Sequence, residues 1–334
     1  MTTTAHTPPP VRIGLLGCAD FAIRRMLPAI DRCPDTLLTA VASRDRSTAR
    51  NTAQRFGACA AESYEAVLAA PDVEAVYVPV PAALHASWVE RALLAGKHVL
   101  AEKPLTTAYS DTLRLAALAR EAGLVLAENV LFVHHGQHAH VRRLLADGAI
   151  GELRAASATF TVPARPADDI RLRPELDGGA LWDVGVYPLR AAMHLLGNDL
   201  EVIGATLTHH PEYEVDLGGA ALLRRADGVT AQLTFGLDHQ YESSYRLVGS
   251  TGRIELTHAF TPPAEHRPTI RLTTSAGVRE ITLDAQDQCT RAMASFAAAI
   301  REGRPGTEDA VVAQARLLDD LRRRATTSPA PEAP

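Results

Sequence analysis

The sequence predicts an α/β protein with an N-terminal doubly wound parallel sheet of the Rossmann type and a C-terminal α+β domain built on a large, mostly antiparallel open sheet. Up to about residue 130, short apolar runs alternate with amphipathic helical patterns, which is typical of right-handed βαβ units. From Val202 to Leu283 the apolar runs follow one another without helices, and Asp227-Gly228 and Thr251-Gly252 are hairpin turn signals. These two styles of patterning predict two domains.

The first domain is expected to span residues 11–130 and to bind a dinucleotide. Its apolar runs, each four to eight residues long, predict strands, and apolar positions at helical spacing predict the segments between them as helices. The expected strands are 11–16, 37–43, 73–80, 98–101 and 124–127, and the expected helices are 21–30, 47–56, 62–70, 84–95 and 110–122.

The second domain is expected to span residues 131–325 and to serve substrate binding and oligomerisation. Alternation of apolar and polar residues predicts half-buried strands. The expected strands are 154–161, 204–208, 220–225, 230–235, 244–248, 253–256, 269–273 and 279–283, and the expected helices are 139–147, 181–196, 289–300 and 307–323. A polar, arginine-rich loop covers 163–177, and residues 1–10 and 326–334, rich in Pro, Thr, Ala and Ser, are expected to be flexible tails.

Composition excludes several classes of protein. The net charge is −5 and the pI about 6.2, which gives no reason to expect nucleic acid or an anionic membrane as a partner. No apolar stretch reaches the roughly 20 residues that span a bilayer, and Met1–Pro10 lacks the features of a secretory signal. Four cysteines without C-x-x-C spacing favour a reduced, cytoplasmic protein.

No metal site is expected. Four histidines cluster in sequence, but only His134 and His138 have the i, i+4 spacing of helical metal ligands, and no carboxylate accompanies them. The clustered histidines are His134, His135, His138 and His140.

Lys103 is the first candidate catalytic residue. The predicted strand at 98–101 ends in Glu102-Lys103-Pro104, and ligands of open α/β sheets bind beyond the carboxyl ends of the strands. Of the 34 lysines and arginines, 32 are arginine, so an ammonium at this position suggests a compact charge that can donate a proton. The alternative is a strand-end lysine that pairs with Glu102.

The turn after the first strand is a candidate pyrophosphate site. It reads Gly17-Cys18-Ala19-Asp20-Phe21-Ala22 and directly precedes a helix, whose N-terminal N–H groups suit an anion. Ala19 departs from the usual middle glycine, so an ordinary strand-to-helix turn is the alternative. After the second strand, Ser43-Arg44 with Arg46 nearby fits a 2′-phosphate better than ribose hydroxyls, which predicts NADP over NAD.

Five stretches together resemble the glucose–fructose oxidoreductase, inositol dehydrogenase and MocA (Gfo/Idh/MocA) family. The resemblance covers nearly everything from residue 11 to 323 and implies that Lys103 lies beside the nicotinamide and the substrate, with Asp183 and Tyr187 completing the site. Many members carry histidine where this chain has Tyr187, which leaves the identity of the acid open. The matching stretches are 11–22, 73–81 with Leu84-His85, 96–104, 148–153 and 178–188.

The chemistry of a ketone reduction agrees with this set. Hydride addition leaves an alkoxide, so a cation or donor must face the oxygen and a proton must be supplied. Asp183 and Tyr187, four residues apart at a helix start, lie on one face, and a neighbouring ammonium would lower the pKa of the tyrosine. Lys103 alone or the Lys103–Tyr187 pair could deliver the proton. The alternatives are a helix N-cap for Asp183 and a packed aromatic for Tyr187.

The resemblance also implies further contacts. Tyr64, Val80, His85, Glu102 and Trp182 are expected near the cofactor. Arg165 is expected to contact cofactor or substrate. Arg171 and Arg173 lie on the same loop, and these arginines either hold phosphates or are merely solvated.

Within the family, the first turn, Ser43-Arg44 and Tyr187 look most like nucleotide-sugar 3-ketoreductases of antibiotic deoxysugar pathways. This implies NADPH-dependent reduction of the C-3 ketone of a dTDP-3,4-diketo-2,6-dideoxyhexose by a homodimer or homotetramer. Two alternatives stay open: a dehydrogenase of a free sugar, cyclitol or dihydrodiol, and a non-catalytic NADP-binding regulator.

Overall fold

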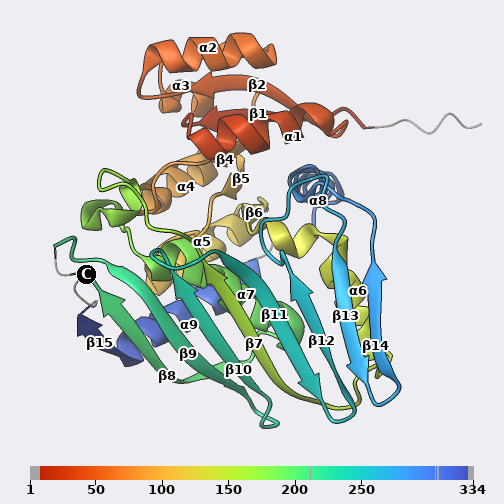
Figure 1. Ribbon diagram of the computed structural model, residues 1–334. Helices are drawn as coiled ribbons and strands as arrows, with labels where there is room; N and C mark the ends of the chain where they lie inside the picture. Colours follow the sequence, from red (N-terminus) through yellow and green to blue (C-terminus); the bar gives the residue numbers. More distant parts are fainter. Residues whose placement is uncertain (1–7, 211, 305, 307, 330–334) are drawn as a thin grey trace, which may run out of the picture.

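The protein consists of two sheet-based units stacked end to end (Figure 1). The computed structural model describes residues 8–210, 212–304, 306 and 308–329. One unit is built on a six-stranded sheet and the other on a nine-stranded sheet. This confirms the predicted α/β class, with a parallel N-terminal sheet and a mostly antiparallel second sheet. None of the helices among the described residues combines the length and the apolar character that crossing a bilayer requires.

The first sheet is parallel throughout and has the order β3-β2-β1-β4-β5-β6. The chain builds outward from β1 to β3 and then returns to the other side of β1, so the switch point lies between β1 and β4. The loops that follow β1, β2, β4 and β5 therefore meet at one edge of the sheet. The strands are β1 (Val11–Leu16), β2 (Thr36–Ala42), β3 (Cys59–Ala60), β4 (Ala75–Val78), β5 (His98–Ala101) and β6 (Leu126–Glu128).

The helices of the first unit begin close to where the patterns predict them. Two of the starts are fixed by side-chain caps: Asp45 accepts a hydrogen bond from Thr48 N, and Ser63 accepts one from Ala66 N. The helical segments are η1 (Ala22–Met26), α1 (Leu27–Arg32), α2 (Arg46–Phe56), α3 (Tyr64–Ala69), η2 (Ala82–Leu84), α4 (His85–Leu94) and α5 (Tyr109–Glu121).

The second sheet has the order β14-β13-β12-β11-β7-β10-β9-β8-β15 and is mixed, since β7 pairs in parallel with β10 and β8 with β15. The strands are β7 (Leu153–Thr161), β8 (Leu200–His209), β9 (Asp216–Arg225), β10 (Thr230–Gly236), β11 (Glu242–Gly249), β12 (Gly252–Thr257), β13 (Thr269–Thr274), β14 (Gly277–Thr282) and β15 (Ala325–Pro329).

Helices cover one face of this sheet and leave the other open (Figure 1). The buried side chains of β7, β10 and β11 form one core with those of α7. On the opposite face, residues such as Gln232 and Arg246 are exposed. The remaining helical segments are η3 (Leu131–His134), α6 (Gly136–Ala146), η4 (Ile170–Leu172), η5 (Pro174–Leu176), η6 (Leu181–Gly185), α7 (Val186–Leu196), α8 (Gln288–Glu302) and α9 (Glu308–Arg324).

The last two helices return to the first unit. Met293 and Phe296 of α8 are buried in the same core as β1 and α1, and Asp287 at the start of α8 pairs with Arg32 of α1 at 2.6 Å. Helix α9 contacts both α5 and β8. The two units are therefore held together by packed helices as well as by the chain crossing near residue 130.

The structure corrects one prediction about the termini. Residues 326–329, predicted to be a flexible tail, form β15 together with Ala325, and β15 pairs in parallel with β8, which would otherwise be the edge strand. An unpaired edge strand offers free backbone donors and acceptors, and α9 ends beside it. Residues 330–334 and 1–7 of the predicted tails lie outside the described residues; Pro9 O accepts a hydrogen bond from Arg301.

Candidate active site

The Lys103 side chain crosses from the first unit to the second. Lys103 follows β5, and its peptide bond to Pro104 is cis. Its Nζ donates to the backbone oxygen of Asp183 at 2.6 Å and to Asp183 Oδ1 at 2.8 Å. The side chains of both residues are largely shielded, with 12% and 20% exposed. Lys103 and Asp183, separated by 80 positions, form a charge pair at the junction of the two units.

Two glycines hold the segment that carries Asp183. A Cβ on Gly178 would collide with the backbone oxygen of Arg171, and a Cβ on Gly179, which adopts φ +113, would collide with a carboxylate oxygen of Asp216. That carboxylate accepts a hydrogen bond from Leu181 N at 2.6 Å through its other oxygen. The start of η6 is thus fixed from both sides. Ala180, not Asp183, occupies the N-cap position of η6, which excludes the helix-cap alternative.

Arg171 completes the charge arrangement. Its Nε donates to Asp183 Oδ2 at 2.7 Å, so each carboxylate oxygen has its own cation. Burial alone would raise the pKa of Asp183, but the charges of Lys103 and Arg171 outweigh it and hold that pKa well below its usual range. The same attraction raises the pKa of Lys103 against the effect of burial. Lys103 is therefore a stable cation at neutral pH.

Tyr187 lies on α7 with its ring facing the lysine. The Lys103 Nζ is 5.2 Å from the ring centre, within the range of a cation–π contact. The ring packs against Phe160 at 4.7 Å between centroids and against Phe260 at 5.9 Å. The expectation of a lowered Tyr187 pKa is wrong, because burial raises the pKa more than Lys103 lowers it. Tyr187 is thus a neutral phenol that can donate a proton.

Glu102 does not pair with Lys103. Its Oε1 accepts hydrogen bonds from Tyr77 at 2.7 Å and from Asn129 at 2.6 Å. The alternative in which Lys103 simply neutralises Glu102 is excluded, since Asp183 and not Glu102 is the lysine's carboxylate partner.

A groove of about 600 Å³ opens at the carboxyl edge of the first sheet. Gly17 has φ +111 there, and a Cβ on it would lie 3.2 Å from Val80 and 3.3 Å from the Tyr64 hydroxyl, so only glycine leaves the backbone accessible. The groove is lined by Gly17, Cys18, Ala19, Asp20, Ser43, Arg44, Arg46, Glu62, Ser63, Tyr64, Glu65, Pro79, Val80, Pro81, Leu84, Trp88 and Ile170.

Eight of the fifteen predicted cofactor residues line this groove. Glu102 and Lys103, which follow β5, are not among its lining residues, and neither are Phe21 and Ala22. Phe21 is 38% exposed, and Ala22 is buried in the core under β1. Sequence reasoning missed Trp88, whose ring meets Tyr64 edge-on at 4.8 Å, and Ile170, which comes from the second unit. Neither has a local motif; only the fold brings them to the groove.

Three other predicted residues are not among those that line the groove. His85 is buried, with Nδ1 2.8 Å from Pro104 O and Nε2 2.7 Å from Val80 O, so it links two loops. Trp182 is buried in the core of the second unit with Arg322 6.0 Å from its ring centre. Arg165 is exposed on the loop 163–177. The structure does not bring these side chains to the groove lining.

Within the histidine cluster of residues 134–140, His138 is held by hydrogen bonds to protein groups. His138 is buried between the Tyr245 hydroxyl at 3.1 Å and Ala259 O at 2.9 Å. Within the described ranges, no group of three metal-ligating side chains lies close enough to hold an ion.

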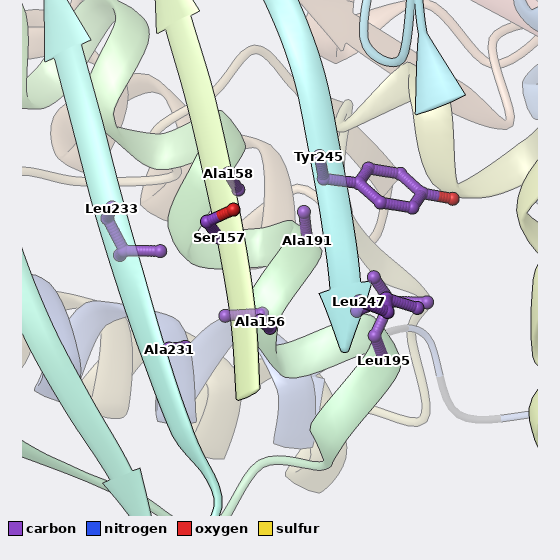
Figure 2. A pocket seen from close by; sticks show the side chains of 10 residues that line it. Ala156, Ser157, Ala158, Ala191, Leu195, Ala231, Leu233, Tyr245 and Leu247 are labelled. Carbon is purple, nitrogen blue, oxygen red and sulfur yellow. The ribbon is translucent and has the colours of Figure 1, made fainter. Parts of the chain in front are cut away.

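A second cavity lies beneath α7 and is a packing gap. Figure 2 shows Ala156, Ala158 and Leu233 of the sheet facing Ala191 and Leu195 of the helix. Its volume of about 10 Å³ is at the lower limit for one water molecule, and its lining is almost wholly apolar. No substrate fits there.

Family models match both units. The oxidoreductase family with an NAD-binding Rossmann fold matches residues 11–130, and the Gfo/Idh/MocA C-terminal domain matches residues 138–255. The chain belongs to the Gfo/Idh/MocA family of oxidoreductases, which confirms the resemblance.

Individual members of the family are similar to this chain over nearly its whole length. The chain is 55% identical to a dTDP-3,4-didehydro-2,6-dideoxy-α-D-glucose 3-reductase from Streptomyces violaceoruber, over 94% of this chain and 95% of the relative. A crystal structure of a 3-ketoreductase from Actinomadura kijaniata with NADP and TDP-benzene matches with a TM-score of 0.93 and 48% identity, covering 96% and 100% of the two chains. A D-xylose 1-dehydrogenase (NADP⁺) from Haloferax volcanii is 33% identical over 96% of this chain and 98% of that protein.

Proposed function

We propose that this protein is an NADPH-dependent 3-ketoreductase of a dTDP-linked 3,4-diketo-2,6-dideoxyhexose. One observation carries the proposal: Lys103 of the first unit and Asp183 and Tyr187 of the second converge in one charge cluster. Ile170, the neighbour of Arg171, lines the cofactor groove, so groove and cluster are adjoining. Two relatives support the substrate class: the Streptomyces violaceoruber protein is named as a reductase of such a dTDP-sugar, and the Actinomadura kijaniata 3-ketoreductase was crystallised with NADP and TDP-benzene.

The groove residues fit NADP. Val80 and Tyr64 lie close to the Gly17 backbone. A ligand can approach this backbone because Gly17 has no side chain to fill the space between them. Arg44, Arg46 and Ser43 lie on the same groove and match a dianionic 2′-phosphate. When bound, the reduced nicotinamide supplies the hydride for the carbonyl carbon.

The residues at the junction handle the carbonyl oxygen. Lys103 donates a hydrogen bond to this oxygen and stabilises the negative charge that develops on it. Asp183, held between Lys103 and Arg171, keeps the lysine charged and directed at the site. Tyr187 donates its phenolic proton to the oxygen, and Lys103 stabilises the resulting phenolate until solvent reprotonates it. In this mechanism Tyr187 donates the proton and Lys103 supports it as the neighbouring cation.

The substrate lies between the two units in this proposal. Arg165 is exposed on the loop 163–177 and is the cation we assign to its diphosphate. The exposed face of the nine-stranded sheet, which carries Leu222 and Gln232, is proposed to pair with a second copy. A cytoplasmic location stays a prediction.

The test follows the absorbance of NADPH in two assays: its oxidation with the dTDP-3,4-diketo-2,6-dideoxyhexose, and its formation from NADP⁺ with free sugars, cyclitols and dihydrodiols. We expect turnover of the nucleotide sugar only, a C-3 hydroxyl in the product by NMR, and calorimetric binding of dTDP alone. Turnover of free sugars without dTDP binding would favour the dehydrogenase alternative. Cofactor binding without oxidation by any ketosugar would favour the regulator.

A further inference from the structure

Glu128, at the end of β6, is a fully buried carboxylate at the junction of the two units. Its Oε1 accepts hydrogen bonds from Leu105 N at 2.9 Å and from Gln314 Nε2 at 2.7 Å. Leu105 is two residues beyond Lys103, so this hydrogen bond holds the segment that carries the lysine. Gln314 belongs to α9, which contributes a second element to the same junction.

Arg190 faces Glu128 from the other unit. Its Nη2 is 3.8 Å from Glu128 Oε2, and its Nη1 donates to Ala310 O at 2.8 Å. Only 6% of its side chain is exposed. Arg190 lies on α7, three residues after Tyr187, so the two residues are neighbours on the helix surface.

Two charge pairs therefore join the two units. Lys103–Asp183 joins them at the site, and Glu128–Arg190 joins them in the interior. The first pair must rearrange when Lys103 turns its hydrogen bond toward a substrate oxygen. The second pair has no exposed face through which a substrate could compete for it.

We propose that Glu128 and Arg190 are positioning residues that set the distance between Lys103 and Tyr187 during turnover. The inference rests on the proposed function of that pair. A buried ion pair is weak evidence for stability, because desolvation offsets the attraction between the charges. A role in geometry explains the pairing better, since a misplacement of about 1 Å between reacting groups can cost about 100-fold in rate.

The experiment compares Glu128→Gln, Arg190→Met, Arg190→Lys and the double variant Glu128→Gln/Arg190→Met with the wild type. We expect kcat to fall about 10- to 100-fold in the first two variants with little change in KM for NADPH. Arg190→Lys should lie between wild type and Arg190→Met. The double variant should be no worse than the poorer single one, because the two residues act as one unit.

A second readout does not depend on turnover. The ionisation of Tyr187 can be followed by tyrosinate absorbance, as the difference between each protein and its Tyr187→Phe counterpart. Displacing Lys103 removes the charge that lowers the pKa of Tyr187, so this pKa should rise in Glu128→Gln and Arg190→Met. Tyr245→Phe, a buried change in the second unit that removes the contact with His138, is the control and should leave both readouts unchanged.

The proposal requires both effects. A lower Tm with wild-type kcat, or a lower kcat with an unchanged Tyr187 titration, would overturn it in favour of a merely structural role. If Arg190→Met does not fold, Glu128→Gln and Arg190→Lys decide the question. If the wild type fails to reduce the nucleotide sugar, the proposed function is wrong, and the titration alone decides whether the pair positions Lys103.

Discussion

The ammonium of Lys103 lies 5.2 Å from the centre of the Tyr187 ring, although the two residues are 84 positions apart and belong to different units. The same ammonium is anchored to Asp183, whose other oxygen is held by Arg171. A cation, a carboxylate and a phenol thus meet where the two units join.

Lys103→Met should lower kcat by about 100- to 10,000-fold, because it removes the cation that faces the developing oxyanion. Steady-state kinetics with NADPH and the nucleotide sugar provides the measurement. Lys97→Met is the matched control, since Lys97 is the other lysine of the chain and its Nζ donates to Ala70 O and Val73 O. That variant should lose stability but keep kcat; a normal kcat in Lys103→Met would remove Lys103 from the mechanism.

Tyr187→Phe should lower kcat by about 100-fold or more and leave Tm nearly unchanged. The ring contacts with Phe160 and Phe260 need no hydroxyl, so packing is preserved while the proton donor is lost. Kinetics and thermal unfolding measure the two effects. A kcat within a few-fold of wild type would show that Lys103 alone delivers the proton.

Arg44→Ala should raise KM for NADPH about 10- to 100-fold and change KM for NADH little, because only the 2′-phosphate loses its partner. Initial rates with both cofactors give the comparison. Arg114→Ala is the control, because Arg114 pairs with Glu90 and Asp111 on the surface, away from the groove. An equal effect on both cofactors would mean that Arg44 does not distinguish them.

Arg171→Met should lower kcat about 10-fold, because Asp183 loses one of its two cations and holds Lys103 less firmly. The pKa of Asp183 should rise toward its usual value, since Arg171 contributes to lowering it. Arg173→Met serves for comparison: the residue lies on the same loop, but it pairs with Glu175 at the surface. Similar losses in both variants would assign the effect to the loop as a whole.

Stability should fall in mild acid. Burial, together with nearby arginines, lowers the pKa of His134, His135 and His194 to about 4 in the folded protein. Because the unfolded value is near 6.5, the unfolded chain binds more protons between pH 6.5 and 4. The stabilisation is complete above about pH 6.5 and is lost as pH falls toward 4.

Urea unfolding across this pH range measures the effect. His134→Gln removes one of the three groups, so its stability should depend less steeply on pH than that of the wild type. A free energy of unfolding that stays constant from pH 7 to 5 would contradict the assignment.

The amino-acid sequence alone predicted the fold class, five of the six strands of the first unit and the motifs that carry the chemistry; it missed the two-residue strand β3. Period-two and helical apolar patterns are local, and Gly17, Lys103 and the Gly178-Gly179 pair mark positions where a strand ends or the backbone must approach another group. Such signals lie within a few consecutive residues, so they can be recognised without knowing which distant segments those residues contact. The family resemblance extended them to Asp183 and Tyr187.

Which charges pair with each other became clear from the three-dimensional structure alone. In the structure, Lys103 pairs with Asp183 and not with the adjacent Glu102. Ile170 of the second unit lines the cofactor groove. Glu128 and Arg190 pair in the interior. Trp182, predicted near the cofactor, is buried in the core of the second unit, and Thr326, predicted in a flexible tail, lies in an edge strand. These contacts depend on which segments, far apart in the sequence, are packed together by burial of apolar surface. The pattern of residues within one segment does not indicate which distant segment it will contact.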